Sequence, residues 1–291
     1  MIYLVLSIFA STLIFVIFKL FAKYNINTLQ AIVVNYLIAC ICGLIGYQNS
    51  IELSLIPQYD WFYYTLGLGA LFIIVFNLMA TTTQQSGLSV VSVATKMAVV
   101  IPIGFGLWYY QEPLGMLKGV GIVFALLAVY LASLKTKSGE PLKSKSLLFP
   151  ILVFLGSGLI DTSLNFLQND FIEDKKLIPL FSATIFAAAG IIGLCVIATQ
   201  KIRGVFKFEI KNIVAGIALG VPNYFSIYFL VKSLRSDLFD SSGIFTINNV
   251  AIVILSTMVG ILFFREKLSL KNWIGIILAI ISIGLVTIAK T

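Results

Sequence analysis

Long runs without charged residues limit what this chain can fold into. Residues 61–95 alone contain no Asp, Glu, Lys or Arg, and the 291-residue chain is 59% hydrophobic and only 11% charged. A soluble domain carries about 25% charged residues, whereas a helix that crosses a bilayer needs about 20 consecutive apolar residues. The sequence therefore predicts an all-α integral membrane protein, with the lipid bilayer as its solvent, and excludes an ordinary soluble domain.

The apolar runs predict ten membrane-spanning helices. Their expected ranges are 2–22, 28–47, 60–80, 87–109, 114–134, 147–168, 178–199, 211–232, 241–264 and 270–289. We expect the polar stretch TTTQQS at 81–86 to form a tight turn between the third and fourth spans. Trp61, Trp108 and Trp273 each stand at the end of a span, where an amphipathic ring prefers the headgroup region. Pro102 stands inside the fourth span, where proline kinks a helix.

The two halves of the chain resemble each other. Residues 106–125 align without a gap on residues 260–279, at the constant offset of 154 residues that separates Glu112 from Glu266. Such a match indicates an internal duplication, so we divide the chain into a first repeat at 1–136, a polar linker at 137–146 and a second repeat at 147–291. Because five helices per repeat is an odd number, the second copy enters the membrane from the opposite side. The sequence thus predicts two inverted five-helix repeats, an arrangement common in secondary transporters.

The duplicated element carries a resemblance to a known family. It reads WYYQEPLGMLKGVG at 108–121 and FFREKLSLKNWIG at 263–275, and YFLVKSLRSDLFDSS at 228–242 is similar to the segment that joins the eighth and ninth spans of that family. Together with the ten spans, these segments resemble the EamA-like branch of the drug/metabolite transporter superfamily. The resemblance covers nearly the whole chain. It implies a ten-helix basket around a central cavity and the export or exchange of small polar metabolites.

Two ionisable residues lie at membrane depth, where such residues mark functional sites by default. Lys96 lies near the middle of the fourth span and Asp161 lies inside the sixth. One interpretation is that Lys96 recognises an anionic group of the substrate, while Asp161 holds the lysine in the empty state or takes a proton. The alternatives are a structural ion pair between two helices, or a lysine that extends to an interface. The small four-helix relatives use a carboxylate in their first helix, and its absence from the first span here puts proton coupling in doubt.

Uncharged polar residues inside the spans form a second group of candidates. They either line a substrate cavity or join neighbouring helices, because an amide in hydrocarbon needs partners. Asn165 follows Asp161 by four residues and shares its helix face. Thr95 and Asn249 occupy equivalent positions of the two repeats, although hydroxyl groups also bond their own helix backbone. The candidates are Thr95, Asn35, Asn77, Asn165, Asn223 and Asn249.

Glu112 and Glu266 are interpreted as structural carboxylates, because each stands just before or within the first turn of the helix that follows it, where a carboxylate stabilises free amides. We expect no catalytic, cofactor or metal site. Histidine is absent, and the three cysteines, Cys40, Cys42 and Cys195, lie in apolar runs, where a thiol behaves as a small hydrophobe. The basic residues are scattered among the connections, which argues against a nucleic-acid partner.

The basic residues also bear on orientation. With both termini on one side, that side holds six Lys and Arg residues against thirteen on the other. The positive-inside rule then places the termini outside the cytoplasm, whereas the family resemblance implies termini inside. We leave the orientation open and expect a monomer or homodimer in a bacterial inner (plasma) membrane.

The leading hypothesis is a secondary transporter, not an enzyme, that works by alternating access around a midplane cavity. Its substrate is a small molecule, with an amino acid or another small organic acid preferred because of Lys96, and protons or a counter-substrate are its candidate coupling partners. A transporter of a sugar or a nucleoside-type metabolite is the alternative within the family. A membrane-embedded lipid enzyme and a non-catalytic membrane subunit are the alternatives from other classes.

Overall fold

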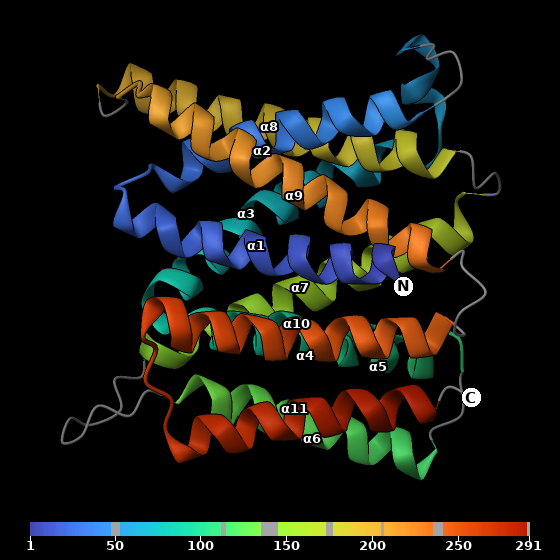
Figure 1. Cartoon of the computed structure of the whole chain (residues 1–291). Helices are drawn as coiled ribbons and strands as arrows, with labels where there is room; N and C mark the ends of the chain where they lie inside the picture. The colour runs from blue at the N-terminus through green and yellow to red at the C-terminus, as the bar shows by residue number, and fades with distance from the viewer. Residues whose placement is uncertain are drawn as a thin grey trace. The chain divides into compact units, whose positions relative to one another are not determined.

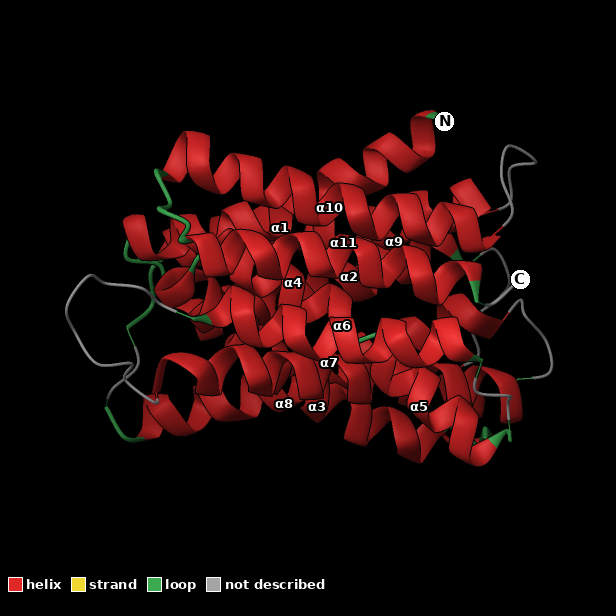
Figure 2. Ribbon diagram, turned by 90° about the horizontal axis from the view of Figure 1, so that it is seen from below, coloured by secondary structure: helices red, strands yellow, loops and turns green. Residues whose placement is uncertain are grey.

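Ten helical segments of the structure are long and apolar enough to cross a membrane. It is a computed structural model that describes residues 1–47, 53–111, 115–134, 145–172, 177–204, 207–234 and 241–289, and helices with their connections account for this part of the chain (Figure 2). The chain is therefore a multi-pass integral membrane protein, as predicted. The elements are α1 (Ile2–Lys23), α2 (Thr28–Gly46), the short 3₁₀ helix η1 (Leu53–Gln58), α3 (Phe62–Ser86), α4 (Leu88–Met97), α5 (Val100–Tyr109), α6 (Met116–Ser133), α7 (Lys145–Asp170), α8 (Ile178–Ile202), α9 (Ile210–Leu234), α10 (Ser241–Phe264) and α11 (Leu270–Ile288) (Figure 1).

The predicted turn at 81–86 is wrong. Helix α3 continues through Ser86, and Gly87 alone separates it from α4. The polar stretch stays helical because its hydroxyl groups bond their own helix: Thr82 Oγ1 donates to the carbonyl oxygen of Leu78 at 2.7 Å, and Thr83 makes the equivalent bond one residue later at 2.7 Å. Threonine satisfied in this way does not end a helix.

The fourth predicted span is divided into α4 and α5. Ala98 and Val99 lie between them and keep right-handed helical backbone angles, so the span is interrupted but continues. Pro102 explains the interruption, because it has no amide hydrogen for the carbonyl of the residue four positions earlier. The carbonyl oxygen of Ala98 instead accepts the amide of Ile101 at 2.9 Å, which tightens one turn.

The described chain divides into two compact units. Unit 1 comprises 1–20, 78–159 and 225–291, and unit 2 comprises 21–77 and 160–224. Each unit takes segments from both sides of the linker at 137–146, so neither coincides with a sequence repeat, and the division into repeats stays a prediction. The boundaries between the units fall within α1, α3, α7 and α9.

In unit 1, α6 and α11 pack side by side (Figure 1). Two glycines allow the close approach. A Cβ on Gly121 of α6 would lie 2.7 Å from Cγ2 of Val286, and a Cβ on Gly275 of α11 would lie 2.5 Å from the amide nitrogen of Ala132. Asn272 then joins the two helix ends, because its amide nitrogen donates to three backbone carbonyls at the C-terminus of α6, those of Leu131, Ala132 and Leu134.

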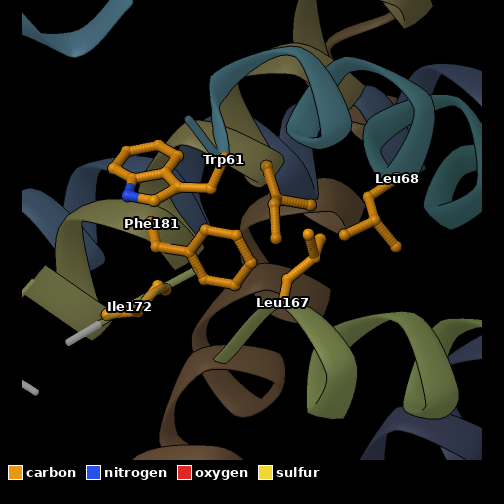
Figure 3. Close-up of a cluster of buried hydrophobic side chains, with 6 residues drawn as sticks. Trp61, Leu68, Leu167, Ile172 and Phe181 are labelled. Carbon is orange, nitrogen blue, oxygen red and sulfur yellow. The ribbon is translucent and has the colours of Figure 1, made fainter. Parts of the chain in front are cut away.

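Unit 2 contains α2 and α8 packed together and a hydrophobic cluster around Trp61 (Figure 3). This tryptophan is 1% exposed; its ring stacks on Tyr59 at 4.9 Å between centroids and meets Phe181 edge-on at 5.5 Å. The position of Trp61 at the start of a span was predicted correctly, but its expected headgroup environment is wrong. The cluster consists of Trp61, Leu68, Leu167, Ile172, Phe181 and Ile185.

Candidate functional site

Lys96 lies in the last turn of α4, immediately before the interruption of the fourth span. It is partly buried, while the residues that follow it, Met97 and Ala98, are fully buried. A cation at the C-terminal end of a helix is favoured by the negative end of the helix dipole. Because that end lies inside a membrane span, the structure places an ionisable side chain at the junction of two half-helices.

A polar face of α4 leads to Lys96. Ser89, Ser92 and Lys96 follow one another at intervals of three and four residues and so share one face of the helix. Both serines are buried, and Ser92 Oγ donates to the carbonyl oxygen of Ser89 at 3.0 Å. Thr95 instead donates to its own helix, at the carbonyl oxygen of Val91, at 2.7 Å, which uses its hydroxyl hydrogen.

Asp161 and Asn165 share an exposed face of α7 with Asn169. The amide nitrogen of Asn169 donates to Oδ1 of Asn165 at 2.8 Å. An exposed polar face on a membrane span is costly against lipid, so this face of α7 is a candidate to border water or another polar group. Lys96 and Asp161 belong to different compact units, and their pairing stays a prediction.

Asn35 and Asn223 join two helices within unit 2. Asn223 of α9 donates its amide nitrogen to Oδ1 of Asn35 of α2 at 3.1 Å, and both side chains are buried. Gly216 and Gly220 of α9 lie against the backbone of α2, which brings the two amides together. Among the described residues, Nδ2 of Asn35 has no hydrogen-bond partner.

The remaining asparagine candidates lie apart from these groups. The amide nitrogen of Asn77 donates to the carbonyl oxygen of Ile73 at 2.7 Å on its own helix, α3. Asn249 of α10 is partly buried. Its neighbour Asn248 is buried and accepts a hydrogen bond from Ser7 Oγ at 3.2 Å.

Glu266 caps a helix, but not the helix expected from the sequence. Its Oε1 accepts the amide of Leu88 at 2.8 Å and its Oε2 accepts Ser89 Oγ at 3.3 Å, both at the N-terminus of α4. The following helix, α11, is capped by Ser269 and Asn272 instead. The sequence could not show this partner, because Leu88 and Glu266 are far apart along the chain. Glu112, the other expected carboxylate, lies outside the described residues.

In the sequence, Lys19 is one of the thirteen basic residues on one side of the expected topology. In the structure its Nζ lies 3.5 Å from Oε1 of Glu266, and it also donates to the carbonyl oxygen of Thr83 at 3.2 Å. The side chains of Lys19 and Glu266 are 22% and 10% exposed. Gly87 has φ +107°, and a Cβ there would lie 2.6 Å from Glu266 Oε1. In the sequence, this junction is marked only by Gly87, a glycine that directly follows the polar stretch 81–86.

Within the described residues, no group of three or more Cys, Asp and Glu side chains is arranged to hold a metal ion. Cys40, Cys42 and Cys195 form no disulfide. The ionisable side chains of the described spans include Lys96, Asp161, the Lys19–Glu266 pair and Lys118 of α6, which is 6% exposed.

Comparison with known proteins gives a relative and a shared fold. No family model matches the chain. An uncharacterized protein of Haemophilus influenzae is 27% identical over 285 residues, which cover 96% of this chain and 95% of that protein. A solved structure, described as the crystal structure of a protein, superposes with a TM-score of 0.56 over 97% of this chain and 98% of the other, at 14% sequence identity. The chain therefore has a full-length bacterial homologue, and its fold is shared with a solved structure.

Proposed function

We propose that this protein is a secondary transporter that carries a small polar metabolite through alternating access. The observation that carries the proposal is the position of Lys96 at the inner end of α4, where the fourth span is interrupted. Interrupted spans with an ion-recognising group at the break are characteristic of substrate sites in secondary transporters. A charge at this depth costs several kcal/mol, so a lysine at this position favours a functional role.

The charge of Lys96 favours an anionic substrate group. An ammonium recognises carboxylate as a compact point charge, so an amino acid or another small organic acid is the preferred class, followed by a sugar or a nucleoside-type metabolite. The competing structural interpretation is that Lys96 only stabilises the last carbonyls of α4. A test must therefore separate loss of ligand binding from loss of stability.

Contacts between equivalent residues support the inverted repeats. Gly121 lies against Val286 as Gly275 lies against Ala132, and both partners are displaced by the same 154 residues. Reciprocal contacts of this kind are what a two-fold relation produces. The packed helix pairs α6–α11, α4–α10 and α2–α8 are also the counterparts expected from the fifth and tenth, fourth and ninth, and second and seventh predicted spans.

Coupling is proposed to use exchange or an ion gradient. Asp161 on the exposed polar face of α7 is the candidate for proton binding, because a carboxylate in a membrane span is the usual proton carrier in transporters. Exchange against a counter-substrate needs no such residue. Asp161→Asn separates the two, since it abolishes proton-driven uptake but leaves exchange intact.

The test of the proposed function is ligand binding and transport by the purified full chain. A panel of amino acids, small organic acids, sugars and nucleosides is first screened by thermal shift. A ligand present at a hundred times its Kd stabilises the folded state by about 2.7 kcal/mol, which is a shift of several degrees. Compounds that shift the wild type are then assayed for uptake and exchange in proteoliposomes.

The matched variants are Lys96→Ala, Lys96→Arg and Lys23→Ala. Lys23 is an exposed lysine at the end of α1, so its variant controls for the loss of one positive charge. We expect Lys96→Ala to remain folded and lose both the shift and the uptake, and Lys23→Ala to retain both. Equal binding by Lys96→Ala would refute the role of Lys96, and absence of uptake and exchange by wild-type protein that binds a ligand would refute the transporter proposal.

A further inference from the structure

Four separate segments of unit 1 meet at the carboxylate of Glu266. The carboxylate belongs to the connection between α10 and α11, and it caps the N-terminus of α4 through Leu88 and Ser89. Lys19 adds the end of α1, and its second bond, to Thr83, adds the last turn of α3. One ion pair therefore ties α1 to a junction that the other three segments already form.

The carboxylate itself is fixed. Its backbone amide donates to the carbonyl oxygen of Gly260 at 2.9 Å. Gly87 and Gly260 pack so closely on it that a Cβ on either would lie within 2.6 Å of a carboxylate oxygen. Helix α4, which it caps, packs against α6, α10 and α11. Glu266 is thus part of a closely packed group of helices, and the flexible lysine is the partner that can leave.

Helix α1 is held to unit 1 by polar contacts at two places. Near its start, Ser7 Oγ donates to the carbonyl oxygen of Ser226 at 2.9 Å and lies 3.2 Å from Oδ1 of Asn248. Near its end, Lys19 makes the contacts with Glu266 and Thr83. The two points are separated by about 18 Å at 1.5 Å per residue. Release of Lys19 would remove the polar contacts at the end of α1, while the buried Phe18 and the contacts of Ser7 still hold the helix to unit 1.

The junction stands at the head of the polar face of α4. Ser89, which contacts Glu266, is the first residue of the face that continues through Ser92 to Lys96. Ser89 and Ser92 are buried, so the part of this face between the junction and Lys96 is closed to water in the structure. Lys96 lies about 12 Å along the helix from Leu88. Because Glu266 contacts both Lys19 and Ser89, a change at Lys19 acts on the end of this face that is nearest the junction.

The sequence has a lysine at the position of Lys19 in one repeat only. The offset of 154 residues takes Glu266 back to Glu112 and Gly260 to Gly106, but it takes Gly87 forward to Ser241. The same offset takes Lys19 forward to Glu173, so the equivalent position of the second repeat is acidic. The two ends of the proposed transport path are therefore chemically different.

We infer that the Lys19–Glu266 ion pair is a latch that closes one end of the path to Lys96 and opens when α1 leaves the junction. The inference rests on the proposed function, because a latch has a role only where access alternates. It adds a residue pair that controls the equilibrium between the two access states. The ion pair favours the state in which the path to Lys96 is closed at the end where α1 terminates.

The test uses a cysteine at Ser92 as a reporter of water access. Ser92 is 0% exposed and lies between the latch and Lys96 on the same face, and Ser92→Cys changes one atom. Cys40, Cys42 and Cys195 are replaced by alanine so that the reporter is the single thiol. The rate of labelling by a cationic, water-soluble methanethiosulfonate is measured with Lys19, Lys19→Met, Lys19→Arg and Lys23→Met.

We expect Lys19→Met to speed labelling by about tenfold, a factor within the range of coupling between conformational states. Lys19→Arg and Lys23→Met keep the slow rate, since arginine retains the ion pair and Lys23 contacts the ring of Tyr24 at 5.7 Å instead. Monodispersity and tryptophan fluorescence establish that each variant is folded. Hydrogen exchange of residues 84–90 in Lys19→Met, without the cysteine changes, provides a second measurement, with faster exchange expected there.

An unchanged labelling rate and unchanged exchange in folded Lys19→Met would overturn the latch. A rise in exchange spread evenly over unit 1 would overturn it as well, because it would mark a purely structural ion pair. Neither measurement needs a transported substrate. Failure of the latch therefore remains distinct from failure of wild-type protein to transport.

Discussion

Asn272 joins α6 to α11, and replacing it should lower the free energy of unfolding more than replacing an exposed asparagine. Its side chain is 7% exposed and makes contacts in two directions. The amide nitrogen faces the carbonyls of Leu131, Ala132 and Leu134 at 3.2, 2.8 and 2.9 Å. The amide oxygen accepts the backbone amide of Ser269 at 2.9 Å, which completes a capping box.

The magnitude follows from the number of hydrogens. The amide group has two hydrogens for three carbonyls, so it supplies about two hydrogen bonds, each with a net contribution of about 1 kcal/mol. Loss of the bond that the amide oxygen of Asn272 accepts from the backbone amide of Ser269 adds about 1 kcal/mol. Asn272→Ala should therefore lower the free energy of unfolding by about 3 kcal/mol, whereas Ser269→Ala, which removes only the cap, should lower it by about 1 kcal/mol.

The assay is equilibrium unfolding of the purified chain in detergent, followed by tryptophan fluorescence. Asn169→Ala is the matched control, because Asn169 is exposed and bonds another exposed asparagine; its effect should lie within about 0.5 kcal/mol. A loss in Asn272→Ala below about 1 kcal/mol, or no larger than that of the control, would refute the assignment of these contacts to stability.

Two further predictions concern other buried positions. Gly87→Ala should lower the melting temperature by several degrees, because its backbone has φ +107° and a Cβ would collide with the carboxylate of Glu266. Gly119→Ala, with no atom within 4 Å of a new Cβ, should leave the melting temperature unchanged. Equal melting temperatures for the two variants would contradict the close packing of Gly87 on Glu266. Trp61→Ala should cost about 3–5 kcal/mol in equilibrium unfolding, and Trp108→Ala, at 73% exposure, less than about 0.5 kcal/mol. Similar losses for both tryptophans would contradict the buried position of Trp61.

Hydropathy was sufficient to predict the spans because a helix that crosses the lipid bilayer must be apolar over about 20 residues. The ranges 178–199 and 241–264 were predicted within three residues of α8 and α10. The prediction of a turn at 81–86 was wrong because hydropathy records how polar a side chain is and not which group it hydrogen-bonds. Threonine hydroxyls bonded to their own helix cost little in a span.

Side-chain partners were less predictable than helices. Asn35 and Asn223 were expected either to line a cavity or to join helices, and they join α2 and α9. Glu266 was expected at a helix start and lies at one, yet the helix is α4 and not α11. Such partners are chosen by tertiary packing between segments far apart in the chain, and no local pattern records them. The interruption after Lys96 was foreshadowed by Pro102, since the chemistry of proline acts locally.

The single-residue connection between α3 and α4 has a mechanical consequence. Because Gly87 is the only residue between the two helices, a tilt of α4 would displace the last turn of α3. Natural or engineered insertions are normally absorbed by long surface loops, but at this corner an added residue would rotate α4 by about 100° about its axis. That rotation would carry Ser89, Ser92 and Lys96 away together. The length of this connection therefore fixes the direction in which the polar face of α4 points.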